Sequence, residues 1–301
     1  MSMRTAVALT ALLLMGAAPD TAAAPACPPD GWTRSSLQQL QAAGFGTLPP
    51  AQTEALGRAL VACLDDADPA LRDGIAYTGL SVWMRGGRFS TDALRALRAD
   101  LYDRMDAPDP QGFGRPFAAL VLAEVARTDR VAPWMTADER AAMVQRAAAY
   151  LEGVDDYRGF QAGDGWRHGV AHGADWLMQL SLNPALDPAQ RQRILDAVAR
   201  QVVPAQHAYV FGEPERLAMP VLLLARAGLN DEAGWQAWLE ALSASASLRD
   251  AALAWQDADW LARRHNLRAF LSALHVSASL SDDAAVKALL PGTAAVLRAM
   301  P

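Results

Sequence analysis

The chain of 301 residues is 52% hydrophobic and 20% charged, with a formal net charge of −6 at pH 7. This composition is ordinary for a globular protein and lacks the basic excess that nucleic-acid-binding proteins carry. Lys287 is the only lysine and lies in an ordinary apolar helix pattern. A Schiff-base lysine and a phosphate-binding Gly-Lys-Ser/Thr loop are therefore both disfavoured.

Residues 1–26 have the composition of a signal peptide. Arg4 precedes an apolar run that is too short to span a membrane, and small residues lie before the expected cleavage point. The mature chain is expected to begin at Pro25 or Cys27. It is expected to be exported, to the periplasm or outside the cell, without a transmembrane anchor. Lipidation of Cys27 is the alternative.

The 2 cysteines, Cys27 and Cys63, both lie in the N-terminal part of the chain. After export they would meet an oxidising compartment, in which disulfides form and persist. The sequence therefore predicts a disulfide that ties the mature N-terminus to an early helix. The alternative is a lipidated or disordered Cys27 and a Cys63 that is a small apolar core residue.

From Ser35 onward, the spacing of apolar residues predicts helices almost without interruption. Prolines and capping residues mark where these helices begin. The expected helical segments are one after Pro49-Pro50, one from Asp68-Pro69, Ser90 to Met105, Phe113 to Arg127, one from a capping box at Thr136 to Leu151, and one from a cap at Asp187-Pro188 to Val203.

No alternating run is long enough to predict a strand, so the expected fold class is all-α. Helices of about 12 to 18 residues joined by short turns predict stacked helical hairpins, arranged as an α-solenoid or as a closed α/α toroid. No repeat of fixed period is present, so the named repeat classes are not supported. Residues 27–301 are expected to form a single all-helical domain.

Chemistry-bearing residues concentrate between Asp155 and Leu180. With Asp164 as N-cap and a helix that begins near Gly165, three residues fall at i, i+4 and i+7 on one helical face: His168, His172 and Asp175. Two imidazoles and a carboxylate suit a divalent metal such as zinc. The alternative is that the histidines only hydrogen-bond neighbouring carboxylates or carbonyls, since the glutamate of the metalloprotease motif H-E-x-x-H is missing.

Two glycines in this helix indicate a close contact. Gly169 and Gly173 each lower the stability of a helix by about 1 kcal/mol relative to alanine at an interior position. We expect another backbone to approach the helix closely at these positions.

Further candidate residues lie before and after this helix. The irregular stretch from Gly153 to Gly165 is where binding groups would collect, although Asp156 and Arg158 could simply form a surface ion pair. Two glutamates flank Pro214 at a helix start, where the helix dipole also favours acidic residues. The candidates are Asp156, Glu213 and Glu215 as general bases, and Arg158, Trp166 and Arg216 as substrate-binding residues.

Three blocks in the second half of the chain carry a family resemblance. They are R-G-F followed by G-W-R-H-G-V-A-H-G-A-D-W-L within 158–177, E-P-E-R-L-A at 213–218, and N-L-R-A-F-L-S-A-L at 266–274. These blocks resemble the bacterial family known as domain of unknown function 2785. The resemblance implies an all-helical domain and favours a functional role for Arg158, and it implies no particular reaction.

Three functions are compatible with these residues. The first hypothesis is a divalent-metal-dependent hydrolase of the cell envelope, with zinc the favoured metal, in which the metal lowers the pKa of a bound water and a carboxylate removes its proton. The second is an exported helical-repeat protein that binds an envelope or small-molecule ligand and whose histidines are structural. The third is a metal-free glycan-processing protein that uses paired carboxylates and tryptophan platforms.

Overall fold

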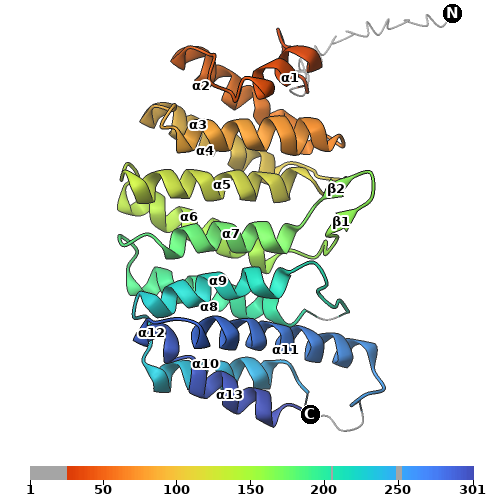
Figure 1. Cartoon of the computed structure of the whole chain (residues 1–301), viewed down its shortest axis with the longest axis vertical. Coiled ribbons are helices and arrows are strands. Elements are labelled where there is room, and N and C mark those ends of the chain that lie inside the picture. The colour runs from red at the N-terminus through yellow and green to blue at the C-terminus, as the bar shows by residue number, and fades with distance from the viewer. Residues whose placement is uncertain (1–25, 205, 249–252) are drawn as a thin grey trace, which may run out of the picture.

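The chain folds into a stack of helices that lie across the long axis of the molecule (Figure 1). The computed structural model describes residues 26–204, 206–248 and 253–301. The helices are α1 (Arg34–Ala42), α2 (Pro50–Ala59), the 3-10 helix η1 (Leu60–Asp65), the π-helix η2 (Ala70–Tyr77), α3 (Thr78–Arg85), α4 (Thr91–Asp106), α5 (Gly114–Val131), α6 (Ala137–Glu152), α7 (Gly169–Ser181), α8 (Pro188–Val202), α9 (Glu213–Arg226), α10 (Glu232–Ser245), α11 (Ala258–Ser279), α12 (Ala284–Lys287) and α13 (Leu290–Ala299).

Successive hairpins place alternate helices in two layers. Helices α3, α5, α7, α9 and α11 contact one another in that order and form what we call the front layer (Figure 1). Helices α4, α6 and α8 pack behind it, each against the front-layer helix that follows it in the chain. The N-terminal helices and α13 lie at opposite ends of the stack, so the arrangement is open. The expected all-α class and the stacked hairpins are confirmed.

Short polar signals in the sequence set the helix ends. Thr136 and Asp187 each accept a hydrogen bond from the backbone three residues on, and Glu139 and Gln190 complete the two capping boxes. Such caps stabilise a helix by about 1 kcal/mol each. Within the described ranges, the only sheet is a two-stranded hairpin of β1 (Phe160–Gln161) and β2 (Gly165–Trp166). No helix in these ranges is long and apolar enough to cross a bilayer.

Cys27 and Cys63 form a disulfide, as the sequence predicted. Cys63 is fully buried in the N-terminal end of the core. The predicted signal peptide falls almost entirely on residues 1–25, outside the described residues. Export and the cleavage point therefore stay predictions.

Reducing the Cys27–Cys63 bond is expected to lower the free energy of unfolding by about 3 to 4 kcal/mol, because the bond joins residues 36 apart and restricts the unfolded chain. Thermal unfolding with and without a reductant measures this difference. A variant with both cysteines replaced by alanine should not respond to the reductant. Equal melting temperatures of the wild-type protein in both conditions would contradict the expectation.

Gly169 and Gly173 allow α6 and the loop after it to approach α7 closely. A Cβ atom at Gly173 would lie 3.0 Å from Cε1 of Tyr150, and one at Gly169 would lie 3.4 Å from the Tyr150 hydroxyl. The Tyr150 hydroxyl donates a hydrogen bond of 3.3 Å to the Gly169 carbonyl. The expected close contact exists, and side chains make most of it, chiefly Tyr150 on α6. Among the atoms nearest to these positions, the one backbone atom is the Asp156 carbonyl oxygen, which would lie 3.7 Å from a Cβ atom at Gly169.

Candidate functional site

The start of α7 differs from the sequence-based prediction. Gly163, between the two short strands, and Gly165, at the start of β2, have φ angles of +90° and +78°, which turn the chain back on itself. A helix with Asp164 as N-cap cannot begin there, and α7 begins at Gly169. His168 is its N-cap and has a left-handed backbone with φ of 56°, which is uncommon for a residue other than glycine. Such conformations gather at functional sites.

His168 is buried between the hairpin and α9. Its ring stacks on Trp166 at 4.7 Å, and its Nε2 atom has no hydrogen-bond partner among the described residues. The nearest carboxylate oxygen, Oε1 of Glu213, is 3.9 Å from Nε2, which is too far for a direct hydrogen bond. Burial lowers the pKa of His168, against the raising effect of Glu213. The ring is therefore neutral at pH 7.

His172 lies one turn further along α7 and is also buried. Its Nδ1 is 3.1 Å from the Pro116 carbonyl, and its ring meets the edge of Phe117 at 5.2 Å. A carbonyl oxygen can only accept, so Nδ1 carries the proton. Burial, followed by the charges of His168 and Arg216, lowers the pKa of His172 to about 3. The ring is neutral at pH 7, and its Nε2 has a free lone pair.

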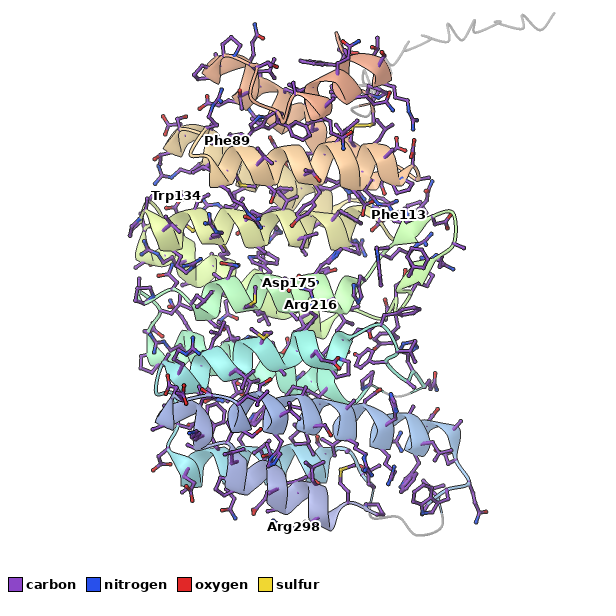
Figure 2. All side chains as sticks on the ribbon, in the orientation of Figure 1. Phe89, Phe113, Trp134, Asp175, Arg216 and Arg298 are labelled. Carbon is purple, nitrogen blue, oxygen red and sulfur yellow. A yellow bond between two sulfur atoms is a disulfide. The ribbon has the colours of Figure 1, made fainter. Side chains whose placement is uncertain are left out.

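Asp175 is bound by an arginine from the next helix of the front layer. Nη1 of Arg216 lies 2.5 and 2.7 Å from the two carboxylate oxygens (Figure 2). The Asp175 side chain is 9% exposed, and that of Arg216 is 45% exposed. Burial raises the pKa of Asp175 to about 6, although Arg216 opposes the shift.

A second ion pair of the same kind lies on α3 and α5. Nε of Arg85 donates to Glu124 at 2.9 Å, and Nη2 donates to the other carboxylate oxygen. Glu124 is buried, whereas the Arg85 side chain is 55% exposed. Neither residue is among those predicted from the sequence. A lone glutamate in the apolar run from Phe117 to Ala126 is a signal that could have indicated Glu124.

His172 and the two ion pairs surround one cavity of about 320 Å³ on the front layer, which we call the groove. It lies between η2, α3, α5, α7 and α9. Its lining residues are Tyr77, Arg85, Leu120, Ala123, Glu124, His172, Asp175, Met178, Gln179 and Arg216. The groove therefore brings together three of the residues singled out in the sequence, His172, Asp175 and Arg216.

The other predicted residues lie outside the groove. Glu213 is buried, and its Oε2 accepts a hydrogen bond of 2.8 Å from the Phe211 backbone. Glu215 is exposed. Asp156 pairs with Arg158, whose Nε donates to it at 2.8 Å, and this pair lies beside a different cavity. The three proposed general bases are therefore not assembled around one centre.

Two of the three predicted zinc ligands, Asp175 and His172, are engaged with other groups, whereas Nε2 of His168 has no hydrogen-bond partner among the described residues. Both oxygens of Asp175 contact Arg216, and Nδ1 of His172 bonds to Pro116. In the part of the chain that the structure describes, no group of three or more His, Cys, Asp or Glu residues could hold a metal ion. The present arrangement does not fit a three-ligand metal site, and zinc binding stays a prediction.

Asn266 fixes the loop that leads into α9. It is fully buried on α11, accepts a hydrogen bond of 2.8 Å from the Tyr209 backbone, and donates one of 2.8 Å to the His207 carbonyl. His265 adds a contact of 3.0 Å to the Tyr209 carbonyl. These bonds set where α9 starts, and so they position Glu213 and Arg216.

Comparison with known proteins gives one match. A family model described as "Protein of unknown function (DUF2785)" matches residues 101–276. No curated protein and no solved structure matches the chain. The matched range includes Glu124, His172, Asp175 and Arg216 of the groove, whereas Tyr77 and Arg85 precede it.

Proposed function

The chain belongs to the DUF2785 family of proteins of unknown function, and we propose that it is a binding protein whose groove accepts a small organic anion. One observation carries this proposal. In both ion pairs of the groove the carboxylate is buried and the guanidinium is about half exposed. The charged groups that a ligand would meet are therefore arginines.

Each arginine keeps N–H groups that its carboxylate does not use. Arg85 contacts Glu124 through Nε and Nη2, and Arg216 contacts Asp175 through Nη1. Nη1 of Arg85 and Nε and Nη2 of Arg216 have no hydrogen-bond partner among the described residues. Since a guanidinium can bind a carboxylate or phosphate through two parallel hydrogen bonds, these groups suit an anion. The buried carboxylates hold the guanidiniums in place.

His172 adds a requirement for a donor on the ligand. Its Nδ1 proton is used by the Pro116 carbonyl, so the neutral ring, which lines the groove, has only its Nε2 lone pair left for a ligand. A ligand group that meets this nitrogen should be a hydroxyl or an amide N–H. The groove therefore favours a hydroxylated carboxylate over a plain one.

A thermal-shift comparison of compounds of different charge tests the proposed function. Malate and succinate should raise the melting temperature, because a ligand that binds only the folded state stabilises it. Malate should raise it more, since it has the additional hydroxyl. Spermidine, a cation, and neutral N-acetylglucosamine should have no effect. Stabilisation by spermidine or N-acetylglucosamine, with none by the two anions, would contradict the proposal.

Affinity for an anion should rise as pH falls from 7.5 to 5. Asp175 has a pKa of about 6, so it becomes neutral in this range and stops competing for Arg216. Sulfate is a suitable probe because its charge is constant in this range. Calorimetric titration at several pH values should show several-fold tighter binding at pH 5, and Asp175→Asn should remove most of this dependence. Unchanged affinity across the range in the wild-type protein would refute the expectation.

The metal-dependent hydrolase remains the second hypothesis, and one observation favours it. Nε2 of His168 is buried, has no partner among the described residues and faces Glu213. Metal analysis of protein purified without a histidine tag decides between the two hypotheses. About one zinc per chain, lost in His168→Ala, would support the hydrolase and count against the binding protein.

A further inference from the structure

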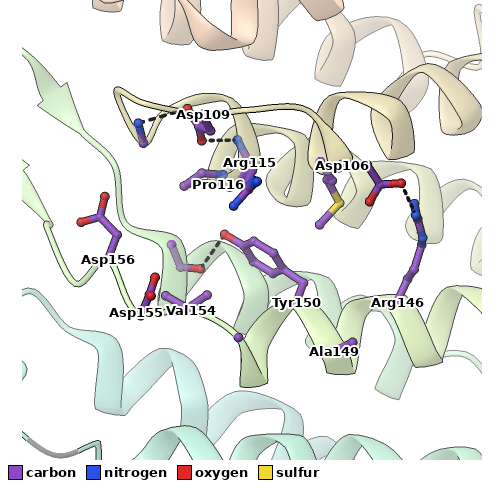
Figure 3. Close-up of a pocket in the computed structure, with 14 residues that line it drawn as sticks. Asp106, Asp109, Arg115, Pro116, Arg146, Ala149, Tyr150, Val154, Asp155 and Asp156 are labelled. Carbon is purple, nitrogen blue, oxygen red and sulfur yellow. Dashed lines mark hydrogen bonds and ion pairs between the residues drawn. The ribbon is translucent and has the colours of Figure 1, made fainter.

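A second and larger cavity, of about 490 Å³, lies behind the front layer (Figure 3). It is formed by the C-terminal ends of α4 and α6, the loops that follow them, and the first residues of α5 and α7. Its volume is within the range of small-molecule sites. Its lining is independent of the groove, because no residue lines both cavities.

Part of the wall of this cavity is apolar. Met105, Pro116, Tyr150 and Val154 line it, and Figure 3 shows the Tyr150 side chain among the lining residues. The hydroxyl of this tyrosine is held by the Gly169 carbonyl at 3.3 Å, so the ring has a fixed position. A compact apolar body could pack on this wall, and an aromatic ring face attracts cations.

Acidic groups outnumber basic ones around this wall. Asp106 pairs with Arg146, and Asp156 pairs with Arg158. Asp109 accepts four backbone N–H bonds at the start of α5. Asp155 has no ion-pair partner among the described residues and is exposed beside Val154.

Among the described residues, Arg115 is the one arginine of the lining without a carboxylate partner, and its guanidinium is directed to a backbone group. Its Nη2 donates to the Ala107 carbonyl at 3.2 Å. The cavity has four aspartates, Asp106, Asp109, Asp155 and Asp156. Three arginines, Arg115, Arg146 and Arg158, lie beside them, so the formal charge of the group is −1. Burial raises the pKa of the Tyr150 hydroxyl. The negative charges of Asp109 and Asp156 raise this pKa further, and the positive charge of Arg115 opposes them.

We propose that this cavity binds an organic cation, an amine carried on a compact apolar body. The ammonium group lies beside Asp155, and the body packs on Tyr150, Pro116 and Met105. The site differs from the groove in the sign of the charge that it selects. It does not depend on the proposed function of the groove.

Three compounds of similar shape and different charge test this site. Benzylamine, benzyl alcohol and benzoate are titrated into the full-length protein by calorimetry. We expect benzylamine to bind most tightly. Asp155→Asn should weaken benzylamine binding about two- to fivefold, which is the effect of one exposed ion pair, and should leave benzyl alcohol unaffected. Asp282→Asn, at an exposed aspartate in the segment between α11 and α12, is the matched control and should change nothing.

A blocking variant identifies the cavity as the location. Ala149 is exposed on α6 and lines the cavity, so Ala149→Phe should fill the space without disturbing the core. Benzylamine binding should be lost in this variant. The proposal is wrong if benzylamine binds Ala149→Phe as well as wild type, if benzoate or benzyl alcohol binds as tightly as benzylamine, or if benzylamine does not bind at millimolar concentration.

Discussion

Asp129→Ala is expected to lower the free energy of unfolding by about 3 to 5 kcal/mol, the largest effect of any single substitution that we predict. The Asp129 side chain is 1% exposed. It accepts hydrogen bonds from the Trp134 and Met135 backbones, at 2.9 and 2.7 Å. It also accepts bonds from Arg140 and from Asn183, at 2.6 and 2.9 Å. Alanine would leave an arginine, an amide and two backbone groups without their acceptor.

This network joins the turn between α5 and α6 to the end of α7, so it also sets the spacing of the groove helices. Urea unfolding of the purified variant measures the loss. Asp92→Ala is the control, because Asp92 is 99% exposed and its nearest arginine atom is 3.9 Å away. That change should cost less than about 0.5 kcal/mol. Similar losses in the two variants would show that the Asp129 network does not stabilise the fold.

His172→Ala is expected to cost about 2 to 4 kcal/mol. The substitution removes the hydrogen bond to the Pro116 carbonyl and the contact with Phe117, and it leaves a cavity where the buried ring was. His172→Asn should cost less, since its amide can still donate to that carbonyl. Denaturant unfolding of both variants tests this order. Loss of a bound metal without loss of stability in His172→Ala would instead support the hydrolase.

The same histidine links stability to pH. Its pKa is about 6.5 in an unfolded chain and about 3 in the folded protein, so the unfolded state binds more protons between these values. Its contribution is complete above pH 6.5 and is lost as pH falls toward 3. The pKa of Asp175 is raised to about 6 in the folded protein, so the folded state binds more protons at this carboxyl between about pH 4 and 6. Its contribution to the free energy of unfolding therefore increases as pH falls through this range, opposite to that of His172. His172→Asn should reduce the net acid sensitivity of unfolding.

Local signals in the sequence predicted the helices well. The capping boxes at Thr136 and Asp187 are present because each involves only residues three apart. The disulfide could be predicted because only two cysteines exist. The start of α7 could not be predicted from the sequence, because two glycines with positive φ turn the segment before it into a hairpin. Helical periodicity does not reveal such a turn.

The groove itself was beyond prediction from local patterns. Asp175 and Arg216 were both singled out, but as a metal ligand and a substrate contact, whereas the structure makes them an ion pair. Arg85 and Glu124 are 39 residues apart in the chain and meet only because α3 packs on α5. Which carboxylate meets which arginine depends on how the helices stack, and spacing along one helix carries no information about that.

The most direct test of the anion-binding groove is calorimetric titration of malate into three proteins. These are the wild type, a double variant with Arg85→Gln and Arg216→Gln, and Arg58→Gln. The last is a matched control, since Arg58 is 49% exposed and pairs with Asp100 on α2 and α4, away from the groove. We predict that the wild type and Arg58→Gln bind malate with equal affinity and that the double variant, shown to be folded by circular dichroism, does not bind it. Equal binding by all three proteins, or none by the wild type, would contradict the assignment of the groove as an anion site.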